Sequence, residues 1–293
     1  MKYKTGSAFR RALEDRIRER SLVGGMPMVR LRKLVAFDRL LARLTKTGPV
    51  AWVLKGGFAL QLRFAASSRT TKDLDLLSLE PSTASWDLLR LAADTDLWDW
   101  FGFEVGRPQG EPMEDSLGGQ RFPVRSLLDG RTFESFPVDI GVGDPVVEEP
   151  EILHTPDFLS FADIDPVPFP TYPVTQHIAE KLHAYTRPHA GAENTRVRDF
   201  VDMLLIATMS RIDGRSLSAA IRATFGARST HDLPGELPDP PSNWAASFRR
   251  SAEELSLAWH DLGSATKAAQ AFLNPVLKGV VGKSWDPESW SWK

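Results

Sequence analysis

Apolar residues recur with helical spacing at the start of the chain. Residues 7–20 and 28–46 form two predicted helices, separated by glycines and a proline. In the second helix, apolar positions three and four residues apart form one stripe that only Asp38 interrupts. Such a stripe is typical of a helix that packs on a sheet.

The next stretch alternates between strand and helix patterns. A short apolar strand over residues 51–54 leads into a glycine pair and a helix over residues 58–65. The following strand carries Asp73 and Asp75, and we expect both carboxylates on one face because side chains alternate along a strand. Further predicted elements are a helix over 84–95, a strand over 101–105, a loop over 106–118, and a hairpin of strands 122–128 and 132–140 joined by Asp129-Gly130. That dipeptide favours a two-residue turn.

The pattern changes after a proline-rich stretch around residues 166–173. Helical spacing then predominates, interrupted by a proline-rich loop over residues 229–242. The predicted helices cover residues 174–187, 194–210, 214–225, 243–258 and 260–277. We therefore predict an α+β chain of two domains, an α/β domain with N-terminal helices over residues 1–170 and a helical domain over residues 171–293.

Composition narrows the function classes. The 293 residues are 42% hydrophobic, enough for one or two cores, and include no cysteine. This excludes disulfides, thiolate zinc sites and cysteine nucleophiles and fits a reducing cytoplasm. No apolar leader or bilayer-length apolar run is present, so we expect a cytoplasmic protein without membrane partners.

The net charge of about −2 gives no overall nucleic-acid signature. Five arginines cluster near the N-terminus, interleaved with acids, and suit either a solvated helix face or an RNA-binding patch. They are Arg10, Arg11, Arg16, Arg18 and Arg20.

Asp73 and Asp75 are the first candidates for chemistry. Two like charges about 4 Å apart repel by roughly 4 kcal/mol at an effective dielectric constant near 20. Either one carboxylate is protonated or a cation lies between them, and Mg²⁺ prefers such oxygen ligands. Asp139, on the second arm of the hairpin, is a possible third metal ligand. Three such carboxylates can hold one or two Mg²⁺ ions that bridge phosphate oxygens.

The glycine pair fits the same chemistry. Gly56 and Gly57 let the backbone approach a ligand, and the amides of a helix N-terminus bind phosphate. Alone, a Gly-Gly pair usually marks only a turn, and Asp-x-Asp is common on surface strands. Their combination with a third strand aspartate is more specific.

The helical half adds a lysine and two acids. Lys181 follows an apolar stripe and either points into a cleft, as a charge on a triphosphate, or faces solvent. Asp199 and Asp202 can share a face of an otherwise apolar helix. One of them is expected to anchor that helix to the first domain by an ion pair while the other serves the site.

Four motifs in this order resemble the AbiEii/AbiGii-type nucleotidyltransferase toxins, which include MenT-like enzymes. They are residues 55–60 (KGGFAL), 69–75 (RTTKDLD), 180–184 (EKLHA) and 198–202 (RDFVD), and the likeness spans roughly residues 50–255. The resemblance implies a polymerase-β-like nucleotidyltransferase core, a mixed sheet flanked by helices, followed by a helical domain, with NTP between them. It also implies a toxin that transfers NMP, often a pyrimidine, to the 3′ end of tRNA and so blocks translation. A cognate antitoxin, a kinase in some relatives, would control it.

The resemblance also assigns roles by position. Asp73 and Asp75 match the metal-binding catalytic pair, and Asp199 or Asp202 matches the essential helical aspartate. Asp139 is the candidate third acid. The implied nucleotide-binding residues are Lys55, Gly56, Gly57, Arg69 and Lys181.

Thr71 lies two residues before Asp73, where some relatives carry a residue that their antitoxin kinase phosphorylates. A phosphate there would add about −1.5 to −2 charges beside the metal site and repel NTP. The alternative is an ordinary threonine at a strand edge.

Two rival functions use the same fold. One is a nucleotidyltransferase that modifies a protein or a small molecule. The other is an inactive binding module, which has no reason to retain two repelling acids.

Overall fold

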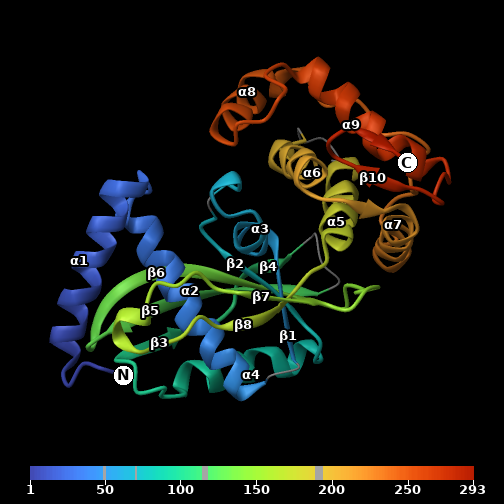
Figure 1. Cartoon of the computed structure of the whole chain (residues 1–293). Helices are drawn as coiled ribbons and strands as arrows, with labels where there is room; N and C mark the ends of the chain where they lie inside the picture. Colours follow the sequence, from blue (N-terminus) through green and yellow to red (C-terminus); the bar gives the residue numbers. More distant parts are fainter. Residues whose placement is uncertain (49–50, 70, 114–117, 189–193) are drawn as a thin grey trace. The chain divides into compact units, whose positions relative to one another are not determined.

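The computed structural model describes residues 1–48, 51–69, 71–113, 118–188 and 194–293, which form two compact units (Figure 1). Unit 1 comprises Met1–Arg63, Thr70–Gly143 and Glu151–Thr171. Unit 2 comprises Phe64–Arg69, Asp144–Pro150 and Tyr172–Lys293. The predicted division into two domains near residue 170 stays a prediction.

Unit 1 is built on a mixed sheet. Among the described residues it has eight strands in the order β3-β5-β6-β2-β1-β8-β7, with β4 paired to β5. β2 runs parallel to β6 and β1 runs parallel to β8, while the other pairs are antiparallel. The strands are β1 Trp52–Lys55, β2 Leu74–Ser78, β3 Phe101–Val105, β4 Gln109–Met113, β5 Gly119–Leu128, β6 Arg131–Val142, β7 Glu151–His154 and β8 Pro168–Thr171.

Helix α2 packs its apolar stripe on this sheet, as the sequence predicts. Its Phe37 ring lies 4.8 Å from Phe136 of β6 and 5.1 Å from Phe58, measured between ring centroids. All three rings are buried. The helices of unit 1 are α1 Gly6–Gly24, α2 Met28–Thr47, α3 Gly56–Phe64 and α4 Ser82–Asp94. Figure 1 shows α1 and α2 side by side, with α2 along the sheet.

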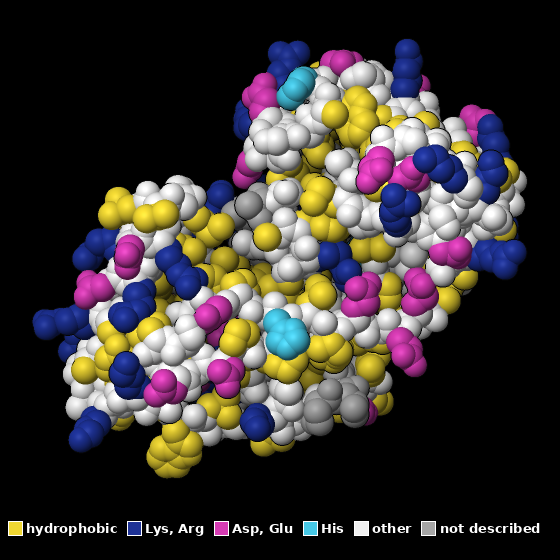
Figure 2. Space-filling view, in the orientation of Figure 1, with side chains coloured by type: hydrophobic (Ala, Val, Ile, Leu, Met, Phe, Trp, Pro, Cys, Tyr) yellow, Lys and Arg dark blue, Asp and Glu magenta, His cyan; other side chains and the backbone are white. Residues whose placement is uncertain are grey.

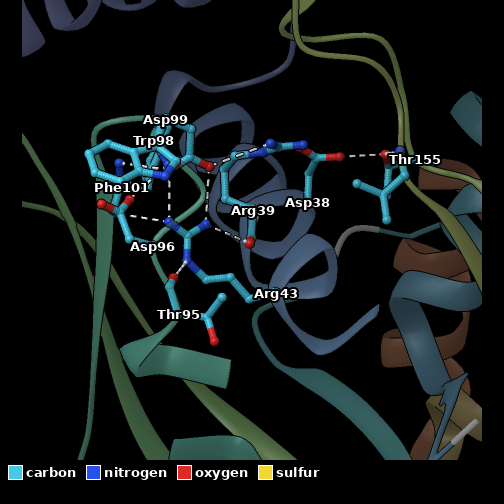
Figure 3. A network of polar contacts seen from close by, with 10 residues as sticks. Asp38, Arg39, Arg43, Thr95, Asp96, Trp98, Asp99, Phe101 and Thr155 are labelled. Carbon is cyan, nitrogen blue, oxygen red and sulfur yellow. Dashed lines mark hydrogen bonds and ion pairs between the residues drawn. The ribbon is translucent and has the colours of Figure 1, made fainter. Parts of the chain in front are cut away.

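The polar Asp38 within that stripe belongs to a buried ion network (Figure 3). Asp38 accepts from Arg39 at 2.6 Å and from the Thr155 hydroxyl. Arg43 donates to both carboxylate oxygens of Asp99, at 3.1 and 2.7 Å. Burial raises the pKa of Asp38, although Arg39 lowers it in part. The network thus joins α2 to two connecting segments of unit 1.

The N-terminal arginines are residues of α1. Figure 2 shows Lys and Arg side chains gathered over this part of the molecule. Three of these arginines make contacts within unit 1. Arg10 donates to the Leu128 carbonyl at 2.9 Å, and the Arg16 guanidinium lies 3.9 Å from the Phe161 ring centroid. Arg20 donates to the backbone carbonyl of Asp157. These contacts favour a packing role over an RNA-binding patch.

The hairpin of β5 and β6 forms around Asp129-Gly130, as predicted. Both turn residues have positive φ angles, 53° and 69°. The pairing shifts by one residue between Ser126–Glu134 and Leu127–Thr132. Phe133 is therefore an extra residue on β6, a β-bulge.

Part of the predicted loop over residues 106–118 is wrong, because residues 109–113 form β4 at an edge of the sheet. Residues 114–117 lie outside the described residues. β8 was missed in the proline-rich stretch. Prolines lack the N–H of a ladder bond, so β8 pairs with β1 at a single residue pair, Leu54–Thr171.

Unit 2 is mainly helical, and each predicted helix is present. They are α5 Val174–Thr186, α6 Val197–Met209, α7 Gly214–Arg228, α8 Ala245–Glu254 and α9 Leu262–Leu277. The described residues also form a small sheet that the sequence analysis missed, β9 Ile212–Asp213, β10 Ser284–Asp286 and β11 Ser291–Trp292. Trp285 holds this sheet to α6, since it is fully buried and donates to the Ala207 carbonyl at 2.7 Å.

A search of the described helices finds no membrane-spanning candidate.

Candidate active site

Four charged residues form a row across four adjacent strands of unit 1. Lys55 of β1 lies opposite Asp75 of β2, Asp75 lies beside Asp139 of β6, and Asp139 lies opposite Arg121 of β5. Residues paired in this way project their side chains from one face of a sheet. The row therefore presents two acids between two bases, and we call it the charged row.

Gly56 makes room for the Asp75 carboxylate. A Cβ atom at position 56 would come within 2.7 Å of the Asp75 Cβ and closer still to its carboxylate. Gly56 also has a φ of +66°, a backbone angle that residues with a side chain rarely adopt. The glycine that opens α3 thus has two physical reasons to be glycine, and one of them is the acid next to it.

Replacing Gly56 by Ala is expected to displace the Asp75 carboxylate and to lower the free energy of unfolding by about 1–3 kcal/mol. The matched control is Gly25→Ala, which has a φ of +69° but nothing within 4 Å of the added Cβ. Urea unfolding measures the loss of stability. Binding of Mn²⁺, used as a probe in place of Mg²⁺, measures the displacement of the Asp75 carboxylate. Equal losses in both variants would show that the backbone angle alone matters.

Asp73 does not lie within the strand, contrary to the prediction. β2 begins at Leu74, whose partner on β6 is Val138. Asp73 is instead held by a local hydrogen bond, since the Thr71 hydroxyl donates to its Oδ1 at 2.6 Å. Thr71 itself is only 6% exposed. Thr70 of this motif lies outside the described residues.

Arg121 is the member of the charged row that the sequence analysis missed. Its Nε and Nη2 atoms donate to the two oxygens of Asp139 at 2.7 and 2.6 Å. Nη2 also lies 3.9 Å from Asp73 Oδ2. The hydrogen bond with Asp139 raises the pKa of Arg121 still further, so its positive charge is permanent. The sequence offers one weak signal for Arg121: it lies at the beginning of the first arm of the hairpin, and Asp139 lies on the second arm.

The donor set fits a magnesium ion shared with a substrate. The described residues contain no group of three or more acidic or histidine side chains placed to hold a metal by themselves. Mg²⁺ usually binds through one or two carboxylates plus phosphate oxygens rather than in an all-protein cage. Asp73 and Asp75 can provide the two carboxylates, and Gly56 leaves the space that Asp75 occupies.

The other predicted site residues form an ion cluster in unit 2. Lys181 Nζ donates to Asp202 at 2.7 Å and to Asp199 at 3.0 Å. Arg69 donates to both oxygens of Asp202, at 3.1 and 3.0 Å. Lys181 therefore points inward, into ion pairs, and two cations share one fully buried acid.

Burial and charge act in opposite directions in this cluster. Burial alone would raise the pKa of Asp202, but Lys181 and Arg69 outweigh it and lower that pKa. Burial alone would lower the pKa of Lys181, but Asp202 and Asp199 raise it. Asp199 differs from Asp202 in exposure, because 18% of its side chain is exposed and none of Asp202's is.

Comparison with solved structures gives the fold. "MenT4, nucleotidyltransferase toxin Rv2826c from Mycobacterium tuberculosis H37Rv" superposes with a TM-score of 0.56 and 17% identity, over 92% of this chain and 97% of that one. JHP933 from Helicobacter pylori has a TM-score of 0.43 and 16% identity, over 83% and 93%. No curated protein sequence matches the chain. The MenT4 likeness confirms the α+β fold, a mixed sheet flanked by helices with a helical C-terminal region.

The sequence itself matches one family over most of its length. Residues 39–278 fit the family described as "Nucleotidyl transferase AbiEii toxin, Type IV TA system". That range includes the charged row and the ion cluster. The protein thus belongs to the AbiEii family of nucleotidyltransferase toxins from toxin–antitoxin systems.

Proposed function

We propose that this toxin transfers NMP from an NTP to the 3′-hydroxyl of tRNA in a Mg²⁺-dependent reaction in the cytoplasm, and so blocks translation. Family membership implies an NTP substrate and an antitoxin partner. The observation that supports the proposed chemistry best is the fit between Gly56 and the Asp75 carboxylate within the charged row. A pyrimidine NTP and a kinase antitoxin are further predictions from the family resemblance.

The reaction needs no covalent intermediate with the protein. The acceptor hydroxyl loses its proton to solvent as its oxygen forms a bond to the α-phosphorus. The bond from that phosphorus to the oxygen that bridges it to the β-phosphorus breaks, and pyrophosphate leaves with that electron pair. Magnesium bound by Asp73 and Asp75 would neutralise phosphate charge. The protein contributes positioning. The Thr71 hydroxyl orients Asp73, and Gly56 leaves space for Asp75.

The residues predicted to contact the nucleotide belong to both units. Lys55, Gly56 and Gly57 belong to unit 1 and are proposed to approach the triphosphate. Lys181 and Arg69 belong to unit 2, and their predicted nucleotide contacts stay predictions. Within the ion cluster, we propose that the buried Asp202 is the anchoring acid, which holds α6 through Lys181 and Arg69 inside unit 2. The more exposed Asp199 is then the substrate-side acid.

Thr71 is proposed as the regulatory phosphorylation site. Thr71→Glu is expected to abolish transfer, because it places a carboxylate beside Asp73. Thr71→Val removes only the hydrogen bond to Asp73 and should lower kcat/KM about fivefold. Thr132→Glu, an exposed position on β6, is the control. Wild-type activity in Thr71→Glu would contradict the regulatory role.

The function is tested by incubating the purified protein with tRNA, Mg²⁺ and each labelled NTP in turn. Extension of tRNA at the 3′ end, dependent on Mg²⁺ and absent in Asp75→Asn, is the expected result. Protein and small-molecule fractions are examined in the same reactions. Label found there instead of on tRNA would overturn the tRNA acceptor, and no label anywhere would indicate an inactive binding module.

A further inference from the structure

Asp139, the acid of the charged row that was expected to be a third metal ligand, accepts hydrogen bonds from Arg121 at both of its oxygens. We propose that Arg121 acts as a resident cation of the active site. It keeps Asp139 out of the metal's coordination shell, so that Asp73 and Asp75 alone hold the metal, and it contacts the nucleotide phosphates with its remaining N–H groups. This inference rests on the proposed function and departs from the expectation that Asp139 is a metal ligand.

The first argument is geometric. Asp139 is 5% exposed, and each of its two oxygens accepts one N–H of Arg121. Such a two-point pair between guanidinium and carboxylate is among the stronger charge-assisted arrangements. The two residues also lie directly opposite each other on β5 and β6, so the sheet itself holds them together. A metal would have to break this pair to bind Asp139.

The second argument is charge. Arg121 offsets the charge of Asp139, so Asp73 and Asp75 are the two neighbouring carboxylates that lie outside this two-point pair. The same guanidinium lies 3.9 Å from Asp73, so it already lies next to the metal pair. Asp75 also interacts electrostatically with Arg121.

The third argument concerns the part of Arg121 that Asp139 does not use. A guanidinium has five N–H donors, and the pair with Asp139 employs one on Nε and one on Nη2. The side chain is 49% exposed, which leaves donors open to a ligand. Because guanidinium geometry matches phosphate oxygens, a triphosphate beside the metal pair is a suitable partner.

The test measures Mn²⁺ binding without nucleotide, by electron paramagnetic resonance, together with KM for NTP. The variants are Asp75→Asn, Asp139→Asn, Arg121→Gln and Arg121→Lys, with Asp94→Asn at an exposed position of α4 as control. Asp75→Asn should weaken Mn²⁺ binding by about tenfold or more, whereas Asp139→Asn should change it by less than about threefold.

Arg121→Gln gives the sharpest expected result. Releasing Asp139 as a third carboxylate should tighten Mn²⁺ binding by about tenfold, while KM for NTP rises by about tenfold because a phosphate contact is lost. Arg121→Lys retains the charge without the two-point geometry, so Mn²⁺ affinity should stay near wild type while KM still rises. It replaces Arg121→Gln if thermal unfolding shows that Gln prevents folding.

Two results overturn the inference: Asp139→Asn weakening Mn²⁺ binding as much as Asp75→Asn, or a wild-type protein that binds no Mn²⁺. If either occurs while tRNA is still extended, the inference fails and the proposed function stands. If the Mn²⁺ pattern is as expected but no nucleotide is transferred, the proposed function fails and the metal assignment stands.

Discussion

Asp75→Asn is expected to lower nucleotidyl transfer by at least about 100-fold, the loss typical when one positioned electrostatic group is removed from an active site. The amide keeps the size of the carboxylate but has no charge for a metal. The position of Asp75 is constrained, because Gly56 lies against its side chain and β2 is paired with β6. The measurement is kcat/KM for NMP transfer at saturating Mg²⁺.

The matched control is Asp94→Asn, which makes the same chemical change at an exposed position of α4. It should leave kcat/KM unchanged. Asp73→Asn should resemble Asp75→Asn. If Asp75→Asn retained more than about a tenth of wild-type activity, Asp75 would not be a metal ligand.

The second large effect concerns stability. Asp202→Ala is expected to lower the free energy of unfolding by about 3–5 kcal/mol, because it leaves Lys181 and Arg69 without their shared buried acid. The side chain of Asp202 has no exposed surface, and that of Lys181 is 9% exposed. Urea unfolding of the full chain, followed by tryptophan fluorescence, measures the loss.

Asp199→Ala is the matched control in the same cluster. It removes a more exposed carboxylate and leaves the Asp202 pairs in place, so a loss of about 1 kcal/mol is expected. Similar losses in the two variants would contradict the assignment of Asp202 as the anchoring acid.

The ion pairs of Asp202 also predict how stability depends on pH. Because the folded-state pKa of Asp202 is lowered, its contribution to stability is present above the unfolded value near about 3.9 and is lost as pH falls through the folded value. Below about pH 4, wild-type stability should therefore fall more steeply with pH than that of Asp202→Asn. Parallel pH profiles would show that Asp202 is not the group responsible.

Local patterns predicted much of the fold. The helical period of α2, the Asp129-Gly130 turn and the strand positions of Asp75 and Asp139 all depend on residues near one another in the sequence. The resemblance to AbiEii toxins likewise depended on short motifs. These features need no knowledge of which strand pairs with which.

Long-range pairing explains most of what was missed. Arg121 becomes a site residue only when β5 pairs with β6 in one register. β8 lies in a proline-rich stretch and pairs with β1 at one position. Asp73 lies outside β2 because the pairing with β6 begins at Leu74. Local patterns along the sequence do not reveal these registers.

The bulge at Phe133 has a consequence for how this active site arose and how it can be lost. If Phe133 were paired like its neighbours, so that there were no bulge, counting one for one from the pair Leu127–Thr132 would bring Arg121 opposite Val138. Asp139 would then project from the opposite face of β6. One residue far from the acids therefore sets the phase of the charged row. A register slip that pairs Phe133 would separate Arg121 from Asp139 although every charged residue of the row remained, whereas deletion of Phe133 itself would leave the two opposite each other.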